Sequence, residues 1–163
     1  MDVQVSNLKT TPGRGRPAAA EREDRRGPRS SPVSRARATV ARYFQALNTL
    51  DLETLSEIVS PELIHDLDSV ERQLGREAFL VYLAARAREY REHVFDIQVM
   101  VNAEGTRAAA EFTLLGFPLA EGPEEEIGDP QTYRISGGLF FQLDQGCILR
   151  VSQHAPPPRT RAL

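Results

Sequence analysis

The stretch VFDIQVMVNAEGTRAAAEFTLLGFPL, Val94–Leu119, decides the fold of this chain. From Phe95 to Val101 apolar side chains alternate with others, and this period of two indicates a β-strand that buries one face. The NAEG segment is typical of a tight turn, and the second half of the stretch returns as the partner strand. We therefore predict an antiparallel hairpin over this stretch.

A second hairpin is predicted after an acidic loop, over TYRISGGLFFQLDQGCILRVSQH, Thr132–His154, with its turn at Asp144–Gly146. Leu139, Phe140 and Phe141 are consecutive, so both faces of this hairpin hold large apolar side chains. One face can pack on helices, and the other needs cover. This predicts a homodimer formed through the sheet.

Upstream of the hairpins the apolar period becomes helical. In the first segment apolar residues recur at i, i+3, i+4 and i+7, namely Val40, Tyr43, Phe44 and Leu47. Ser34 is its expected N-cap. A second, short helix is expected between Asp51, its cap, and Pro61, and a third over GREAFLVYLAARAREYRE, residues 75–92. Two helices, a short strand, a third helix and then two hairpins predict an α+β fold, with the helices gathered on one face of an antiparallel sheet.

Composition narrows the class of protein. The 163 residues suit one domain, and a formal net charge of −3 argues against nucleic acid as a partner. No apolar run approaches the roughly 18 residues of a membrane span, and no apolar leader is visible. Cys147 is the only cysteine, so no intrachain disulfide can form and a thiolate zinc site is not expected. We expect a cytoplasmic protein without membrane contact.

The two ends of the chain differ from its centre. Residues 1–32 are rich in Pro, Gly and Arg and almost free of large apolar side chains, which predicts a disordered tail. Residues 1–33 contain seven basic and four acidic side chains, a charge of +3. A solvated extension is the plain interpretation, and contact with nucleic acid or an anionic membrane is the alternative. We expect one ordered domain over 33–154 and a second disordered tail over 155–163.

A polar cluster interrupts the apolar segment SPELIHDLDSVE, Ser60–Glu71. On an extended strand His65 shares a face with two leucines, while Asp66 shares the opposite face with Asp68. If the leucine face is packed, His65 is buried and the aspartates lie on a rim or in solvent. If the strand edges a pocket, Asp66 is the candidate base and His65 tunes it.

The order of elements, together with ARYFQALNTLDLETLSEIV, GREAFLVYL and GGLFFQLDQGCILRV, resembles the nuclear transport factor two-like superfamily. Within it the chain is similar to SnoaL-like and ketosteroid isomerase-related proteins over about Ser34 to His154. The resemblance implies a cystatin-like α+β roll, in which a curved antiparallel sheet wraps the helices as a cone with a hydrophobic small-molecule pocket. Members include isomerases, polyketide cyclases, epoxide hydrolases and dehydratases, and others only bind ligands. The fold therefore does not settle the chemistry.

The resemblance also implies catalytic residues. Tyr43 matches the helix tyrosine of the steroid isomerases, and Asp66 lies near their carboxylate base, with His65 beside it. Their third group, a protonated carboxylic acid, has no counterpart because the matching strand reads ISGGLFF. Loss of one such donor costs on the order of 100- to 1000-fold in rate, so steroid isomerase activity is not expected. We predict a cofactor-independent isomerase, cyclase or hydrolase; the alternative is a non-catalytic ligand-binding or dimeric interaction module.

Further residues are candidates for contacting an apolar small-molecule ligand: Asp68, Tyr82, Tyr90, Glu111 and His154. Each has a plainer interpretation, such as the start of a turn for Asp68 or helix packing for the two tyrosines. Glu111 can pair with a basic side chain on an exposed strand face. The histidines and aspartates have no recognised metal-ligand spacing, so we expect neither a metal nor a cofactor.

Overall fold

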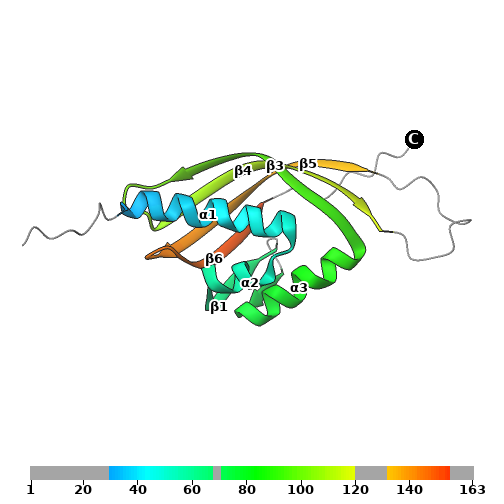
Figure 1. Ribbon diagram of the computed structural model, residues 1–163, viewed down its shortest axis with the longest axis horizontal. Coiled ribbons are helices and arrows are strands. Elements are labelled where there is room, and N and C mark those ends of the chain that lie inside the picture. The colour runs from blue at the N-terminus through cyan, green and yellow to red at the C-terminus, as the bar shows by residue number, and fades with distance from the viewer. Residues whose placement is uncertain (1–29, 68–70, 120–131, 155–163) are drawn as a thin grey trace, which may run out of the picture.

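The structure, a computed structural model, describes residues 30–67, 71–119 and 132–154. Its helices are α1 (Pro32–Thr49), α2 (Leu52–Ile58) and α3 (Arg76–Glu89). Its strands are β1 (Val59–Asp66), β2 (Arg72–Leu74), β3 (Tyr90–Val101), β4 (Arg107–Pro118), β5 (Tyr133–Asp144) and β6 (Cys147–His154). Figure 1 shows α1 running beneath the long curved strands, with α2 and α3 on the same side of the sheet. The predicted α+β fold is confirmed.

The six strands form one sheet in the order β2-β1-β6-β5-β4-β3. Both predicted hairpins are confirmed, since β3 pairs antiparallel with β4 and β5 pairs antiparallel with β6. The sheet is mixed, however, because β1 runs parallel to β6. The expectation of a wholly antiparallel sheet was wrong at this junction. Alternation and turns specify each hairpin, but they do not specify how strands from distant hairpins meet.

The ends of the helices follow local hydrogen bonding. Ser31, rather than Ser34, is the N-cap of α1, because the Ser31 hydroxyl accepts a 3.1 Å hydrogen bond from the Ser34 N–H. Pro32 occupies the first turn, so the helix begins inside the segment expected to be tail. Asp51 caps α2 as predicted. The remainder of both expected tails lies outside the described residues, and within the described ones no helix is long and apolar enough to cross a membrane.

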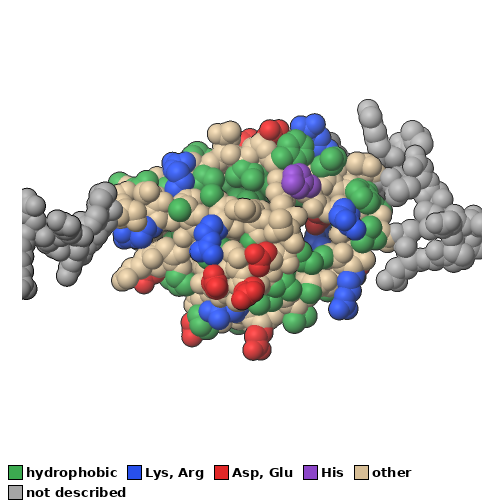
Figure 2. Space-filling view, viewed as in Figure 1, with side chains coloured by type: hydrophobic (Ala, Val, Ile, Leu, Met, Phe, Trp, Pro, Cys, Tyr) green, Lys and Arg blue, Asp and Glu red, His purple; other side chains and the backbone are tan. Residues whose placement is uncertain are grey.

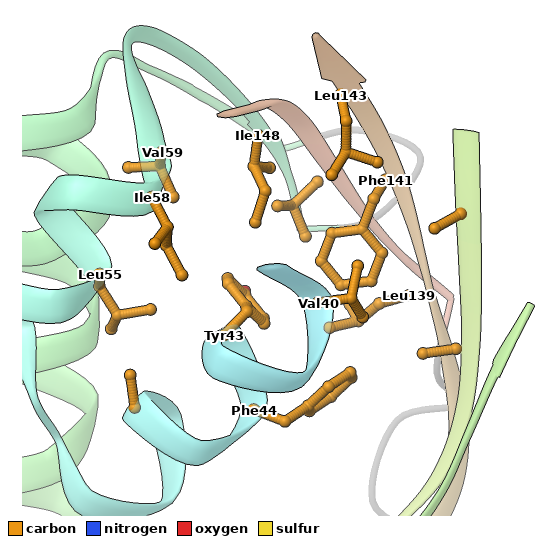
Figure 3. Close-up of a cluster of buried hydrophobic side chains, with 14 of the residues drawn as sticks. Val40, Tyr43, Phe44, Leu55, Ile58, Val59, Leu139, Phe141, Leu143 and Ile148 are labelled. Carbon is orange, nitrogen blue, oxygen red and sulfur yellow. The ribbon is translucent and has the colours of Figure 1, made fainter. Parts of the chain in front are cut away.

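The core forms where α1 meets the concave face of the sheet. Figure 3 shows Tyr43 and Phe44 of α1 beside Phe141 and Leu139 of β5. The Tyr43 ring meets Phe141 edge-on at 5.2 Å between centroids and stacks on Phe79 of α3 at 6.3 Å. Aromatic pairs at these distances add to the stabilisation from burial alone. The helical spacing seen in the sequence therefore places one face of α1 in the core.

A bulge interrupts β3 in its middle. The register with β4 shifts between Phe95 and Gln98, and Asp96 has φ 52°. A bulge bends its strand and increases the twist. Just before it, the Asn48 side chain donates to the Val94 carbonyl and accepts from the Val94 N–H, both at 2.8 Å. These bonds tie the end of α1 to β3 at the place where the cavity begins.

Candidate functional site

A cavity of about 730 Å³ lies between α1, α3 and the concave face of the sheet. Its apolar lining includes Phe44, Leu47, Leu83, Phe112, Ile135 and Leu139. Figure 2 shows a hollow between the end of α1, α3 and β3, with charged side-chain atoms visible inside it. An apolar cavity of this size with a few inward polar groups is typical of a small-molecule site.

His65 supplies a polar group at the buried end of this cavity. The residue is only 4% exposed, and its Nδ1 lies 3.2 Å from Oε1 of Gln73 in β2. Because the amide oxygen can only accept, Nδ1 is the donor in this contact, and Nε2 is left with a lone pair that has no partner among the described residues. Burial lowers the pKa of His65 despite the hydrogen bond to Gln73, which raises it. The imidazole is therefore neutral at pH 7.

Two tyrosine hydroxyls accompany His65. Tyr43 and Tyr82 both line the cavity, and the Tyr82 ring meets the His65 ring at 5.4 Å. Burial raises the pKa of both hydroxyls, so each stays protonated at neutral pH and can donate a hydrogen bond. Gln153 of β6 also lines the cavity. The cavity thus brings together one proton acceptor and several donors.

Asp66 lies on the opposite face of β1. Its carboxylate accepts hydrogen bonds from Nε of Arg72 and Nε of Arg150, both at 2.6 Å, and from Oγ of Ser152 at 2.8 Å. Although burial raises the pKa of Asp66, these three hydrogen bonds outweigh that effect and hold it at about 2. The pleat of β1 sends His65 inward and Asp66 outward, so Asp66 is absent from the cavity lining.

The residues predicted from the sequence to contact a ligand also lie on both faces of the sheet. Tyr90, like Tyr43, Tyr82 and His65, lines the cavity. Glu111 is exposed on the outer face of β4, opposite Gly138. His154 ends β6 on that outer face as well, and its ring meets the exposed Phe140 ring at 5.2 Å. Asp68 lies outside the described residues.

A second polar cluster lines the outer part of the cavity. The Arg86 guanidinium donates two hydrogen bonds of 2.7 Å to Glu92, and the Tyr133 hydroxyl donates to the same carboxylate at 2.5 Å. Arg86 also lies over the Tyr90 ring, 4.8 Å from its centroid. Burial and the hydrogen bond to Glu92 raise the pKa of Tyr133.

The sequence interpretation did not include Arg86, Glu92 or Tyr133 in the site. One signal was available for Arg86, since Tyr82, Arg86 and Tyr90 follow at four-residue spacing and so share a helix face. Nothing local marks Tyr133, which reaches Glu92 only because β5 and β3 pair with opposite edges of β4, where Gly116 lies between the two residues. Among the described residues no group of three or more His, Cys, Asp or Glu is placed to hold a metal ion.

The curved sheet, the three helices and the cavity beneath them define an α+β domain of the nuclear transport factor two-like superfamily. More particularly, residues 40–151 match the SnoaL-like domain family, and the chain belongs to that family.

Solved structures agree with this assignment. A candidate polyketide cyclase from Xanthomonas campestris pv. campestris is 34% identical with a TM-score of 0.69, and the match covers 76% of this chain and 91% of that one. Another from Pseudomonas putida KT2440 is 35% identical with a TM-score of 0.67, covering 79% and 94%. An LEH-like epoxide hydrolase from M. tuberculosis is 17% identical with a TM-score of 0.62, covering 77% and 81%, a likeness of fold alone. No curated protein matches the chain.

Proposed function

We propose that the cavity binds an apolar cyclic molecule carrying a carbonyl group and catalyses a cofactor-independent isomerisation, cyclisation or hydrolysis by acid–base chemistry. One observation carries the proposal. His65 is buried against the cavity, neutral, and held by Gln73 in the tautomer that leaves Nε2 unprotonated. A neutral imidazole with a free lone pair is a competent general base near pH 7.

The tyrosines supply the complementary part of the chemistry. Removing a proton from the carbon beside a carbonyl leaves negative charge on the carbonyl oxygen. Tyr43 and Tyr82 remain protonated and can stabilise that charge by hydrogen bonding. The apolar side chains around the hydroxyls lower the local dielectric constant, which strengthens these interactions. His65 would receive the proton at Nε2 and return it to another atom of the substrate.

Asp66 takes a different role in this proposal. A carboxylate with a pKa of about 2 is a weak base, and its oxygens accept three hydrogen bonds on the outer face of the sheet. We infer that Asp66 fixes β1 against β2 and β6. By fixing the strand, Asp66 also keeps His65 in position on the opposite face of β1.

The base assignment is tested by hydrogen exchange on a model ketone. Wild type and His65→Gln are incubated with 2-tetralone in D₂O, and deuterium incorporation beside the carbonyl is followed by NMR. Wild type should accelerate exchange above the buffer rate, and the variant should lose on the order of 100-fold or more of that acceleration. Asp66→Asn serves as the control and should keep most of it. Full acceleration in His65→Gln with loss in Asp66→Asn would return the base role to Asp66.

A second proposal concerns assembly. Phe140 and Met100 are 52% and 58% exposed on the outer face of the sheet, and Ala109 lies between them in register. This apolar strip is not covered within the described residues. We infer that a second copy of the chain covers it and that the protein is a homodimer through its sheets.

A further inference from the structure

The outer part of the cavity holds a guanidinium that is already fixed in place. Nε and Nη2 of Arg86 each donate a 2.7 Å hydrogen bond to Glu92, one to each carboxylate oxygen. The guanidinium also covers the Tyr90 ring at 4.8 Å. Ion pairing on one edge and stacking on one face restrict an arginine strongly. Arg86 therefore loses little conformational freedom when it binds a ligand.

Hydrogen-bond donors exceed acceptors around this guanidinium. Glu92 accepts from Arg86 through both oxygens, and Oε1 also accepts from the Tyr133 hydroxyl. Arg86 has five N–H groups. Glu92 takes two of them. Because Arg86 lines the cavity, the N–H groups without a partner among the described residues are available to a ligand.

Only one arginine side chain of the lining faces inward, because Arg91 is exposed and lies on the other face of β3 from Tyr90 and Glu92. Glu92 balances the charge of Arg86, so the excess of donors is what favours a ligand group that accepts hydrogen bonds. A carboxylate matches the planar donor edge of a guanidinium.

We propose that Arg86 anchors a carboxylate on the ligand of this cavity. The proposal rests on the function proposed above and narrows its substrate class to an apolar molecule that bears a carboxylate as well as the reacting carbonyl. Tyr82 separates the two positions, because its ring meets that of His65 at 5.4 Å and it lies one helical turn before Arg86. A carboxylate held at Arg86 therefore directs the carbonyl end of the molecule toward His65.

The test compares two probes that differ in charge alone, 9-anthracenecarboxylate and 9-anthracenecarboxamide, by calorimetric titration at pH 7.5. Hydrogen bonds to charged groups predict that wild type binds the carboxylate on the order of tenfold to a hundredfold more tightly than the amide. Arg86→Gln should abolish this preference, so that the loss of affinity is much larger for the carboxylate than for the amide. The control, Arg88→Gln, removes an exposed charge from the same helix and should keep the preference.

A second variant separates loss of the anion anchor from misfolding of the protein. Arg86→Gln alone leaves the Glu92 carboxylate without its cation, whereas Arg86→Gln with Glu92→Gln removes both charges. The double variant should still bind the amide and show no carboxylate preference. Equal wild-type affinity for the two probes, or a preference that survives in the double variant, would overturn the anion anchor while the apolar cavity and the His65 chemistry stand. Binding of neither probe by wild type would overturn the cavity's proposed function as well.

Discussion

Replacing Asp66 by Asn is expected to destabilise the protein without altering the cavity. The carboxylate accepts hydrogen bonds from Arg72, Arg150 and Ser152, and an amide can satisfy these donors only in part. The shift of its pKa from 3.8 to about 2 corresponds to roughly 2 kcal/mol of stabilisation. Arg72 and Arg150 are 53% and 39% exposed, so solvent screening reduces the expected loss to about 1 kcal/mol.

The pH dependence of this loss has a definite sign. The folded-state pKa of Asp66 lies below its ordinary value of 3.8, so the ionised carboxylate favours folding. The stabilisation is complete above about pH 4 and is lost as the pH falls through about 2. The difference in unfolding free energy between wild type and Asp66→Asn should therefore narrow over the same interval.

Urea unfolding at pH 7 and at stepwise lower pH measures this difference directly. Asp96→Asn is a matched control, since Asp96 is exposed and asparagine accepts its positive φ equally well. It should change stability by less than about 0.5 kcal/mol. Unchanged stability of Asp66→Asn at pH 7, together with loss of catalysis, would refute the structural role and point to Asp66 as the base.

Three further outcomes are expected. An NMR titration should give His65 a pKa below its ordinary value of 6.5. The contribution of His65 to stability is then complete above pH 6.5 and falls as the solution is acidified. A pKa above 6.5 would contradict the burial of this side chain. Phe140→Asp should convert a dimer to a monomer in light scattering, whereas a wild-type monomer at micromolar concentration would refute the sheet interface. Gly116→Ala should weaken carboxylate binding, because the added methyl group would lie 2.6 Å from the Tyr133 ring and displace Tyr133 from Glu92. Unchanged binding would show that Tyr133 does not support the site.

Much of the fold was predictable because its signals are local. The period of two in β3, the helical spacing in α1 and the turn before β6 each depend on neighbouring residues. The turn illustrates this well, since Gln145 and Gly146 both have positive φ, as the tight turn of a two-residue hairpin requires. The parallel pairing of β1 with β6 joins residues far apart in sequence, and no local pattern encodes it.

The candidate site was predictable only in part, for a related reason. Strand alternation correctly put His65 and Asp66 on opposite faces, but the sequence left open which face met the cavity. The leucines beside His65 decide the matter, because Leu63 is fully buried and Leu67 lines the cavity. The Arg86–Glu92–Tyr133 cluster draws on α3, β3 and β5, so only the assembled sheet reveals it.

The position of β6 has a consequence for biosynthesis. This strand is the last one in the described chain, yet it lies between β1 and β5. A ribosome completes β1 and its histidine long before it makes residues 147–154, which join that strand to the remainder of the sheet. Until then β1 and β5 each present an unpaired edge to other chains, a known route to aggregation. These two edges stay open to such pairing until β6 leaves the ribosome, and the two parts of the sheet join only in that step.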